Sequence, residues 1–517
     1  MKQRATNATS KMEQEALLPP SAIDESFPSD SEFSTTGSVS GATDKAKKRG
    51  AENIFQAINL LLRRNTGEDG SLAISTAFLI MVSMSYGSAV IILPYTLQQL
   101  GPLLWLLFTV GCFLILAFCA VMLKESCVHI MLFGKDRISR SLLVRRPYPT
   151  IAEYSVGKRF SKVVEATMYV ALGAEVLAYG LLGATSMNRV IPLWLEGDDR
   201  IRIWLLIGFF VMLPFMMVGT YSDLTMPAFV AVFTSFLASL CIFIVSVVAK
   251  YYYGARTSSY KTITLVKEEH IFKIFGEILF AAAGPALLLP NIVVLLKKPE
   301  KFQTPILFSH LCVVLLYALL AIVPFIIFGQ TVEASIIDTL QDAILALKMS
   351  PVWLSVITLA SISLAIHFTM VTVLCANPIF LNLENKFNIP PEFTWKRFAL
   401  RSSIALAFVL VDIMIPYFSP VISIVGALPL ALLCIIYPII VYFHTFEKKS
   451  NYMKLFLGFV LCLTFALMIG NTIFSIWDIV VYFELPSFKA VKHFGNQTVK
   501  DTWRKAALRK NFTFTQL

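Results

Sequence analysis

The chain has 517 residues, of which 56% are hydrophobic and 15% are charged, and its mean hydropathy is +0.70. Soluble proteins usually carry about 25% charged residues, so the composition excludes an ordinary soluble protein and favours a membrane protein with several spans. The net charge of +11 does not indicate nucleic-acid binding. Lys and Arg concentrated in the loops on the cytoplasmic side of a membrane explain it.

The N-terminal segment, residues 1–70, is polar and rich in Ser, Thr, Asp and Glu. Such a composition cannot bury enough apolar surface to fold alone, so we expect a disordered cytoplasmic tail. Within it, residues 13–18 (Glu-Gln-Glu-Ala-Leu-Leu) are similar to the acidic dileucine signal that sorts proteins to endosomes and lysosomes. Two locations therefore stay open, the plasma membrane and an endolysosomal or vesicular membrane.

The first apolar run, residues 72–99, is long enough to cross a bilayer but is interrupted. Small and polar residues from Ser83 to Ala89 stand in its middle, and Pro94 follows. Such residues are costly at mid-membrane depth unless the backbone they loosen faces protein or a water-filled site. We therefore predict a discontinuous first span.

The apolar pattern as a whole predicts eleven spans in a transmembrane domain of residues 71–483. The sixth contains the run Ala281-Ala282-Ala283-Gly284-Pro285 and is also predicted to be discontinuous. A short helix outside the membrane is expected at Val332–Leu347. The predicted spans are 72–99, 102–126, 161–191, 201–219, 225–250, 271–296, 304–329, 352–382, 398–418, 420–443 and 453–483.

Charges in the loops indicate the orientation. A cytoplasmic N-terminus places the strongly basic loop between the second and third spans on the cytoplasmic side, as the positive-inside rule requires. Eleven spans then place the C-terminal tail, residues 484–517, outside the cytoplasm. Two acceptor sequons in this tail, at Asn496 and Asn511, predict glycosylation there.

Five segments carry a family resemblance through their order and spacing. They are Tyr86–Tyr95 in the first span, Tyr148–Gly157 before the third, Phe280–Pro290 with Lys297–Phe302 in and after the sixth, Asn377–Phe380 with Leu383 and Glu384 at the end of the eighth, and Arg401 with Ile415–Phe418 and Gly426–Pro429 in the ninth and tenth. Together they resemble the amino acid/auxin permeases, a branch of the amino acid–polyamine–organocation transporters. The resemblance covers roughly residues 71–480. It implies an all-α polytopic membrane protein with a LeuT-like 5+5 inverted repeat and an eleventh transmembrane helix.

Two broken spans at equivalent places in two halves point to a midplane substrate site. Freed backbone N–H groups at half-helix ends can bind a carboxylate, and freed carbonyls can bind an ammonium group or a cation. The zwitterion of an amino acid offers both groups. The predicted substrate-binding residues are Ser85, Tyr86, Gly87, Ser88, Ala89, Phe280, Ala281, Ala283 and Gly284.

Ionisable and hydroxyl side chains at membrane depth are candidates for ion coupling, because burying them in lipid is costly. Two structural alternatives to ion coupling stay open. The histidine can be neutral and hydrogen-bonded within the helix bundle, and the hydroxyls can be hydrogen-bonded to their own helix. The residues of this kind that we select are Glu175, Glu277, His367, Thr369 and Thr372.

The sequence thus predicts a secondary active transporter that moves an amino acid across the lipid bilayer by alternating access, with a proton as the coupling ion. The alternatives are an amino-acid-sensing transceptor with little flux and a sodium-coupled symporter. No phosphate-binding Gly-rich loop, nucleophile elbow or metal-ligand cluster occurs in the sequence. We therefore expect no enzyme activity, no cofactor, no bound metal and no nucleic-acid partner.

Overall fold

The computed structural model describes residues 72–87, 89–133, 143–144, 146–190, 198–217, 224–253, 271–390, 394–414, 418–447 and 450–484. Within these residues helices dominate and no strand occurs; one isolated bridge pairs Leu72 with Leu296. The predicted all-α class is confirmed. The N-terminal tail, Ser88 and residues 485–517 with Asn496 and Asn511 lie outside the described residues, so the expectations placed on them stay predictions.

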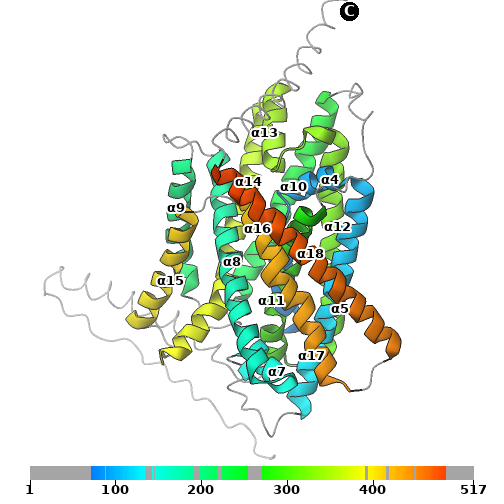
Figure 1. The fold of residues 1–517 in the computed structure, drawn as a ribbon. Helices are drawn as coiled ribbons and strands as arrows, with labels where there is room; N and C mark the ends of the chain where they lie inside the picture. Colours follow the sequence, from blue (N-terminus) through cyan, green and yellow to red (C-terminus); the bar gives the residue numbers. More distant parts are fainter. Residues whose placement is uncertain are drawn as a thin grey trace, which may run out of the picture. The chain divides into compact units, whose positions relative to one another are not determined.

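The first half of the membrane domain contains a broken span followed by four continuous ones (Figure 1). A short helix, α7, precedes the third span of this half. The helices are α3 (Ile74–Ser85), α4 (Leu93–Leu100), α5 (Pro102–Phe133), α7 (Pro147–Ser155), α8 (Lys158–Val190), α9 (Asp198–Met216) and α10 (Thr225–Tyr253).

The second half repeats this order and adds one span. The short helix α13 precedes its third span, at the place where the sequence predicts a helix outside the membrane. The helices are α11 (Ile271–Leu295), α12 (Gln303–Phe328), α13 (Ile336–Ala346), α14 (Pro351–Lys386), α15 (Trp395–Met414), α16 (Phe418–Val425), two π-helical segments (Gly426–Leu430 and Leu432–Ile436), α17 (Tyr437–Thr445) and α18 (Asn451–Glu484).

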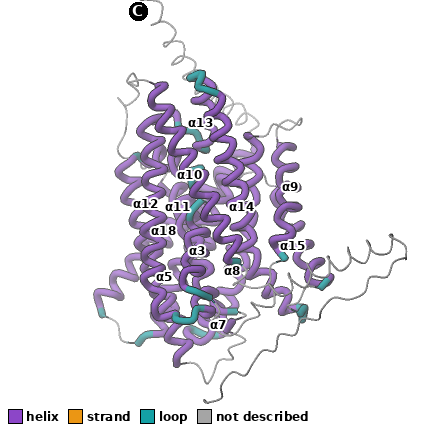
Figure 2. The backbone as a smooth tube through the Cα atoms, turned by 180° about the vertical axis from the view of Figure 1, so that it is seen from behind, coloured by secondary structure: helices purple, strands orange, loops and turns teal. Residues whose placement is uncertain are grey.

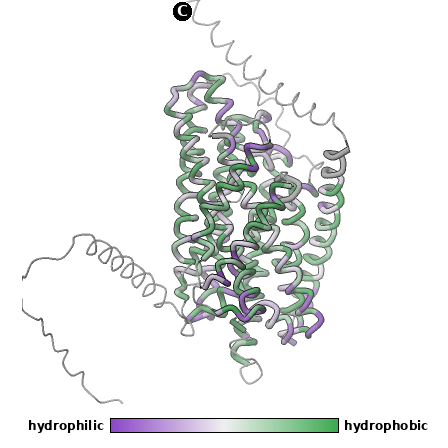
Figure 3. The backbone as a smooth tube through the Cα atoms, turned by 90° about the vertical axis from the view of Figure 1, so that its left-hand side faces the viewer, coloured by the Kyte–Doolittle hydropathy of each residue, from purple (hydrophilic) through white to green (hydrophobic). Residues whose placement is uncertain are grey.

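Eight helical stretches in the described part of the chain are long and apolar enough to cross a membrane. The broken α3–α4 unit, α9 and α15 supply the other three predicted spans. With 19 and 20 residues, α9 and α15 are each about 30 Å long, the thickness of the hydrocarbon core. Figure 3 shows hydrophobic stretches along the helices, with hydrophilic residues mostly near their two ends.

The two halves have opposite orientations. The Leu72 amide donates to the Leu295 carbonyl at 3.1 Å, so α3 begins where α11 ends and the two helices are antiparallel. In Figures 1 and 2, α7 lies at one end of the helices and α13 at the other. Because each short helix precedes the third span of its own half, the second half is an inverted copy of the first.

The first span is broken, as predicted. After α3 ends at Ser85, Tyr86 is extended and Gly87 has φ +120°, before α4 begins at Leu93. Only glycine takes up such a φ without strain. Gly87 is therefore the residue that allows the chain to leave the helix here.

The predicted break in the sixth span is wrong, because α11 is a continuous helix with Pro285 and Pro290 inside it. Each proline removes one amide donor, but every residue from Ile274 to Val294 is buried, and neighbouring helices can support the locally weakened ladder. Gly284 serves packing instead. A Cβ built on it would lie 2.5 Å from the Met84 carbonyl oxygen, so its hydrogen lets the end of α3 approach α11.

Two further glycines bring α11 against the tenth span. A Cβ on Gly276 would overlap the Ser423 carbonyl, and one on Gly426 would overlap the Gly276 carbonyl. The eleventh span is fastened at the same place, since the Asn471 side chain donates to the Phe272 carbonyl at 2.6 Å. Small residues permit the close helix contacts that stabilise membrane proteins, so the start of α11 is rigidly held.

A buried charge cluster ties α9 and α15 to the end of α14. Glu384 on α14 accepts hydrogen bonds from Arg397 at 2.8 Å and from Arg401, both on α15. Arg401 also donates to the Met216 carbonyl in the last turn of α9. Its positive charge complements the negative end of that helix dipole.

The packing at Gly276 leads to a stability prediction. We expect Gly276→Ala to lower the thermal unfolding temperature, because overpacking costs about 1–3 kcal/mol or more when backbone must move. The matched control is Gly458→Ala on α18, where a Cβ meets nothing within 4 Å. Thermal unfolding of the purified variants measures both. Equal unfolding temperatures for Gly276→Ala and the wild type would contradict the packing described here.

Candidate functional site

The break in the first span leaves main-chain amide and carbonyl groups without helical hydrogen bonds near the middle of the span. A local turn holds part of it, with Val90 donating to the Gly87 carbonyl at 3.3 Å and Ile92 donating to the Ala89 carbonyl at 2.9 Å. The amides of Ala89 and Ile91 donate to no acceptor in the described part of the chain. Both stand just before α4, at the positive end of its dipole. The turn therefore offers donors for an anionic group.

Tyr317 of α12 forms hydrogen bonds with the backbone at the end of α3. Its hydroxyl donates to the Ser85 carbonyl and accepts from the Gly87 amide at 3.3 Å. Its ring stacks on Tyr86 with the centroids 5.9 Å apart. One side chain thus bonds a carbonyl and an amide that the end of α3 leaves without a helical partner. The sequence analysis missed Tyr317, although a lone hydroxyl in the apolar run 313–323 was a signal.

His367 of α14 faces the same break. Its Nδ1 lies 2.9 Å from the Ala231 carbonyl of α10, so Nδ1 carries the hydrogen of the neutral ring. Its Nε2 is buried and has no hydrogen-bond partner among the described residues. A Cβ built on Gly87 would collide with this ring, Nε2 being the nearest atom. An unshared electron pair therefore points at the glycine of the break.

Glu175 of α8 brings a carboxyl group close to the end of α3. The Cys375 thiol of α14 donates to Oε2 at 3.2 Å, and the same sulfur lies 3.9 Å from the Met84 sulfur. The other carboxyl oxygen, Oε1, is buried with no partner in the described chain. Cys375 is a second residue that the sequence analysis did not select.

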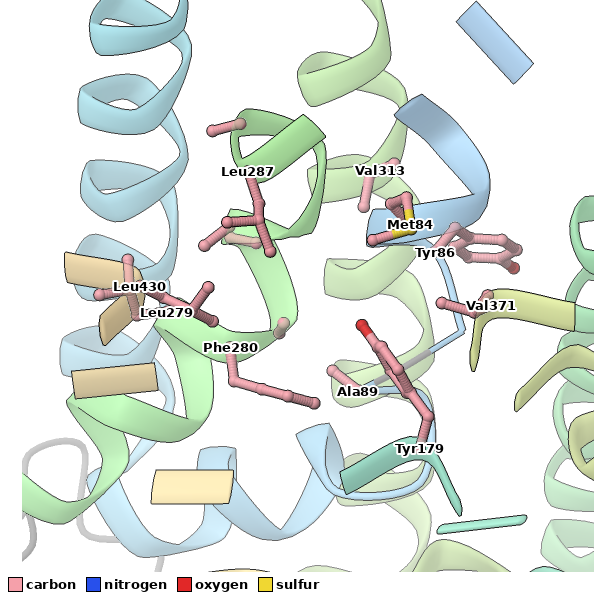
Figure 4. Close-up of a cluster of buried hydrophobic side chains, with 14 of the residues drawn as sticks. Met84, Tyr86, Ala89, Tyr179, Leu279, Phe280, Leu287, Val313, Val371 and Leu430 are labelled. Carbon is pink, nitrogen blue, oxygen red and sulfur yellow. The ribbon is translucent and has the colours of Figure 1, made fainter. Parts of the chain in front are cut away.

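The wall formed by α11 consists of buried small and aromatic residues. Phe280, Ala281 and Ala283 are all at most 1% exposed. The Phe280 ring lies 5.5 Å from the Tyr179 ring of α8, centroid to centroid. Figure 4 shows the Tyr179 side chain reaching from α8 to a place beside Ala89, with Phe280 nearby. The aromatic pair joins α8 to α11 beside the break.

Of the other three predicted coupling residues, the two threonines lie away from the break. The hydroxyls of Thr369 and Thr372 donate back to their own helix, to the Ala365 carbonyl at 2.8 Å and the Phe368 carbonyl at 2.7 Å. Both threonines line a cavity between α8, α9, α14 and α15. Glu277 is buried on α11, three residues before Phe280. The structure thus groups Glu175 and His367 near the break and separates the two threonines from it.

Known proteins resemble the chain over most of its length. The family model described as "Transmembrane amino acid transporter protein" matches residues 70–479. The amino acid transporter AVT1B of Arabidopsis thaliana is 24% identical over 403 residues, which cover 76% of this chain and 68% of the relative. AVT1E of the same plant is 23% identical over 394 residues, covering 74% and 68%.

Among solved structures, that of a mutant manganese transporter from Eremococcus coleocola superposes with a TM-score of 0.47 at 12% sequence identity. The superposition covers 85% of this chain and 94% of that chain.

The double role of the Tyr317 hydroxyl is testable by Tyr317→Phe. We expect faster amide hydrogen exchange over residues 86–92 and a lower unfolding temperature, because each buried backbone group left unbonded costs about 1–3 kcal/mol. Hydrogen exchange read by mass spectrometry reports on the segment directly. Tyr452→Phe is the matched control, since Tyr452 is 87% exposed and should change neither quantity. Unchanged exchange in Tyr317→Phe would refute the bridging role.

Proposed function

Because the chain belongs to the transmembrane amino acid transporter family, we propose that it is a secondary transporter that carries an amino acid through the break in its first span. The observation that carries the proposal is the interruption between α3 and α4, where Tyr86, Gly87 and residues 89–92 are unwound between packed spans. Unwound backbone at membrane depth is tolerated where it lines a site.

The α-carboxylate and the α-ammonium group of an amino acid can each bind complementary groups in this turn. The amides of Ala89 and Ile91, together with the positive end of α4, suit the α-carboxylate. The Ser85 carbonyl and the Tyr317 hydroxyl suit the α-ammonium group, which donates three hydrogen bonds. In the conformation described here Tyr317 occupies this place. We propose that the substrate replaces it as a partner of the backbone.

The packing supports alternating access. The broken span packs against α11 and α12 on one side and α10 and α14 on the other, and Tyr86 and Ala89 are buried. A solute therefore reaches the turn only when one group of helices moves against the other. We propose that α3, α5, α11 and α12 rock against the helices around α8 and α14.

A proton is the coupling ion that the side chains favour. The buried Glu175 carboxyl group and the open Nε2 of His367 flank the end of α3 from two directions, and both groups can take up or release a proton. A sodium site of hydroxyls is less well supported, because Thr369 and Thr372 bond to their own helix.

We propose that the end of the helices that carries α7 faces the cytoplasm. Lys158 and Arg159 begin α8 directly after α7, whereas Asp338 and Asp342 belong to α13 at the other end. This is the charge asymmetry of the positive-inside rule. The proposed membrane is either the plasma membrane or an endolysosomal or vesicular membrane.

The transport proposal predicts uptake by the purified protein in liposomes. We expect a neutral amino acid to accumulate when the pH differs across the membrane, and a protonophore to abolish the accumulation. A sodium gradient alone should drive none. Binding without flux under either gradient would favour the sensing transceptor. Absence of both binding and flux would refute the proposed function.

The coupling proposal predicts that two conservative variants lose proton-driven accumulation but keep most of their substrate exchange. In Glu175→Gln and His367→Gln we expect accumulation driven by the pH gradient to fall about tenfold or more, because neither variant side chain can carry the coupled proton. Exchange of labelled for unlabelled substrate, which needs no gradient, should fall much less. Thr369→Val is the matched control and should retain both activities. Equal losses of exchange and accumulation in the first two variants would show a structural or substrate-binding role instead.

A further inference from the structure

The cavity lined by Thr369 and Thr372 lies between α8, α9, α14 and α15. Its volume is about 360 Å³. This volume lies within the range of about 300–1,000 Å³ typical of small-molecule sites. Figures 1 and 2 both show α9 and α15 side by side at the margin of the helices. Tyr179, which packs on Phe280 beside the break, also lines this cavity, but no step of the proposed transport mechanism takes place in it.

One carboxyl group faces this apolar space. Asp412 of α15 lines the cavity and is only 5% exposed. It forms no hydrogen bond or ion pair with the part of the chain that the structure describes, while Arg397 and Arg401 on the same helix are engaged with Glu384. Gly180 of α8 makes room for it, since a Cβ there would lie 2.8 Å from Asp412 Oδ2. A buried carboxyl group without a partner is costly.

The residues that line the cavity suit a ligand with a long apolar chain. Between Trp204 and Met216 nine residues of α9 line the cavity, and these two residues lie about 18 Å apart along the helix. Met187, Met212 and Met370 are among its lining residues, and flexible methionines adapt to varied apolar shapes. Three further lining residues, Ile207, Val211 and Phe215, are 40–52% exposed, so the cavity borders the surface that faces lipid.

We propose that this cavity binds a hydrophobic organic cation, a protonated amine with a long apolar chain, whose ammonium group pairs with Asp412. The pairing neutralises the isolated carboxylate, and the chain lies along α9. The ligand reaches the cavity from the lipid phase, where such amines accumulate.

Other ligand classes fit less well. A neutral acyl chain fills the apolar walls but leaves Asp412 without a partner, and an anion is repelled by it. A zwitterionic amino acid would bring its carboxylate close to that of Asp412 and has too little apolar surface for the walls. Only an amine with a long chain satisfies both the charge and the apolar length.

The experiment measures binding of radiolabelled n-dodecylamine to the full-length protein in phosphatidylcholine nanodiscs. We expect one saturable site per chain, with at least tenfold weaker binding in Asp412→Asn and in Gly208→Leu. Gly208 lines the cavity and a Cβ on it meets nothing within 4 Å, so a leucine there fills the space without a clash. Gly111→Leu on α5, where a Cβ also meets nothing within 4 Å, is the matched control and should bind like the wild type.

A competition arm separates charge from apolar contact. Unlabelled 1-dodecanol has the same chain and no charge, so we expect it to compete at least tenfold more weakly than unlabelled dodecylamine. The proposal would be overturned in favour of a lipid-chain site if Asp412→Asn bound dodecylamine as tightly as the wild type does. It would also be overturned if dodecanol competed as strongly as dodecylamine. Equal binding in Gly208→Leu and Gly111→Leu would place the amine outside the cavity and also overturn it. The readout is binding, so the result is independent of whether the protein transports amino acids.

Discussion

The central constraint on this protein is that lipid cannot hydrogen-bond to the peptide backbone. A helix broken in mid-membrane leaves amide and carbonyl groups without helical partners, and the surrounding helices must replace them. Here the Tyr317 hydroxyl bonds one carbonyl and one amide at the end of α3, and α13 takes up another group, since the Ile336 amide donates to the Ile91 carbonyl at 3.0 Å. The broken span therefore depends on two elements of the other half of the chain.

That dependence links the break to the ends of the transporter. Because α13 holds the Ile91 carbonyl and α12 holds Ser85 and Gly87, a movement of either helix changes which backbone groups are free. At the opposite end Tyr148 of α7 donates to the Leu433 carbonyl in the π-helical part of the tenth span. Burial raises the pKa of the Tyr148 hydroxyl well above its usual value, so it stays a donor. Short helices thus fasten both ends of the spans.

The ionisable side chains inside the helices include a bonded cluster and several isolated groups. Glu384 is bonded to two arginines and joins three helices, as expected for a structural ion cluster. Glu175, His367 and Asp412 are buried without any basic or acidic side chain as an ion-pair partner among the described residues. Isolated ionisable groups in a membrane are costly and usually functional. Two of them flank the break, and the third faces the cavity between α8, α9, α14 and α15.

The sequence by itself determined the all-α membrane class and the break at Gly87, because these follow from apolar length and from the conformations open to glycine. It also selected Glu175 and His367, since charge at membrane depth is rare. Only the tertiary structure decided that α11 is continuous, that Gly284 serves packing, and that Tyr317 bonds the broken backbone. The physical reason is that proline and glycine weaken a helix locally, but whether the helix opens depends on neighbours distant in sequence.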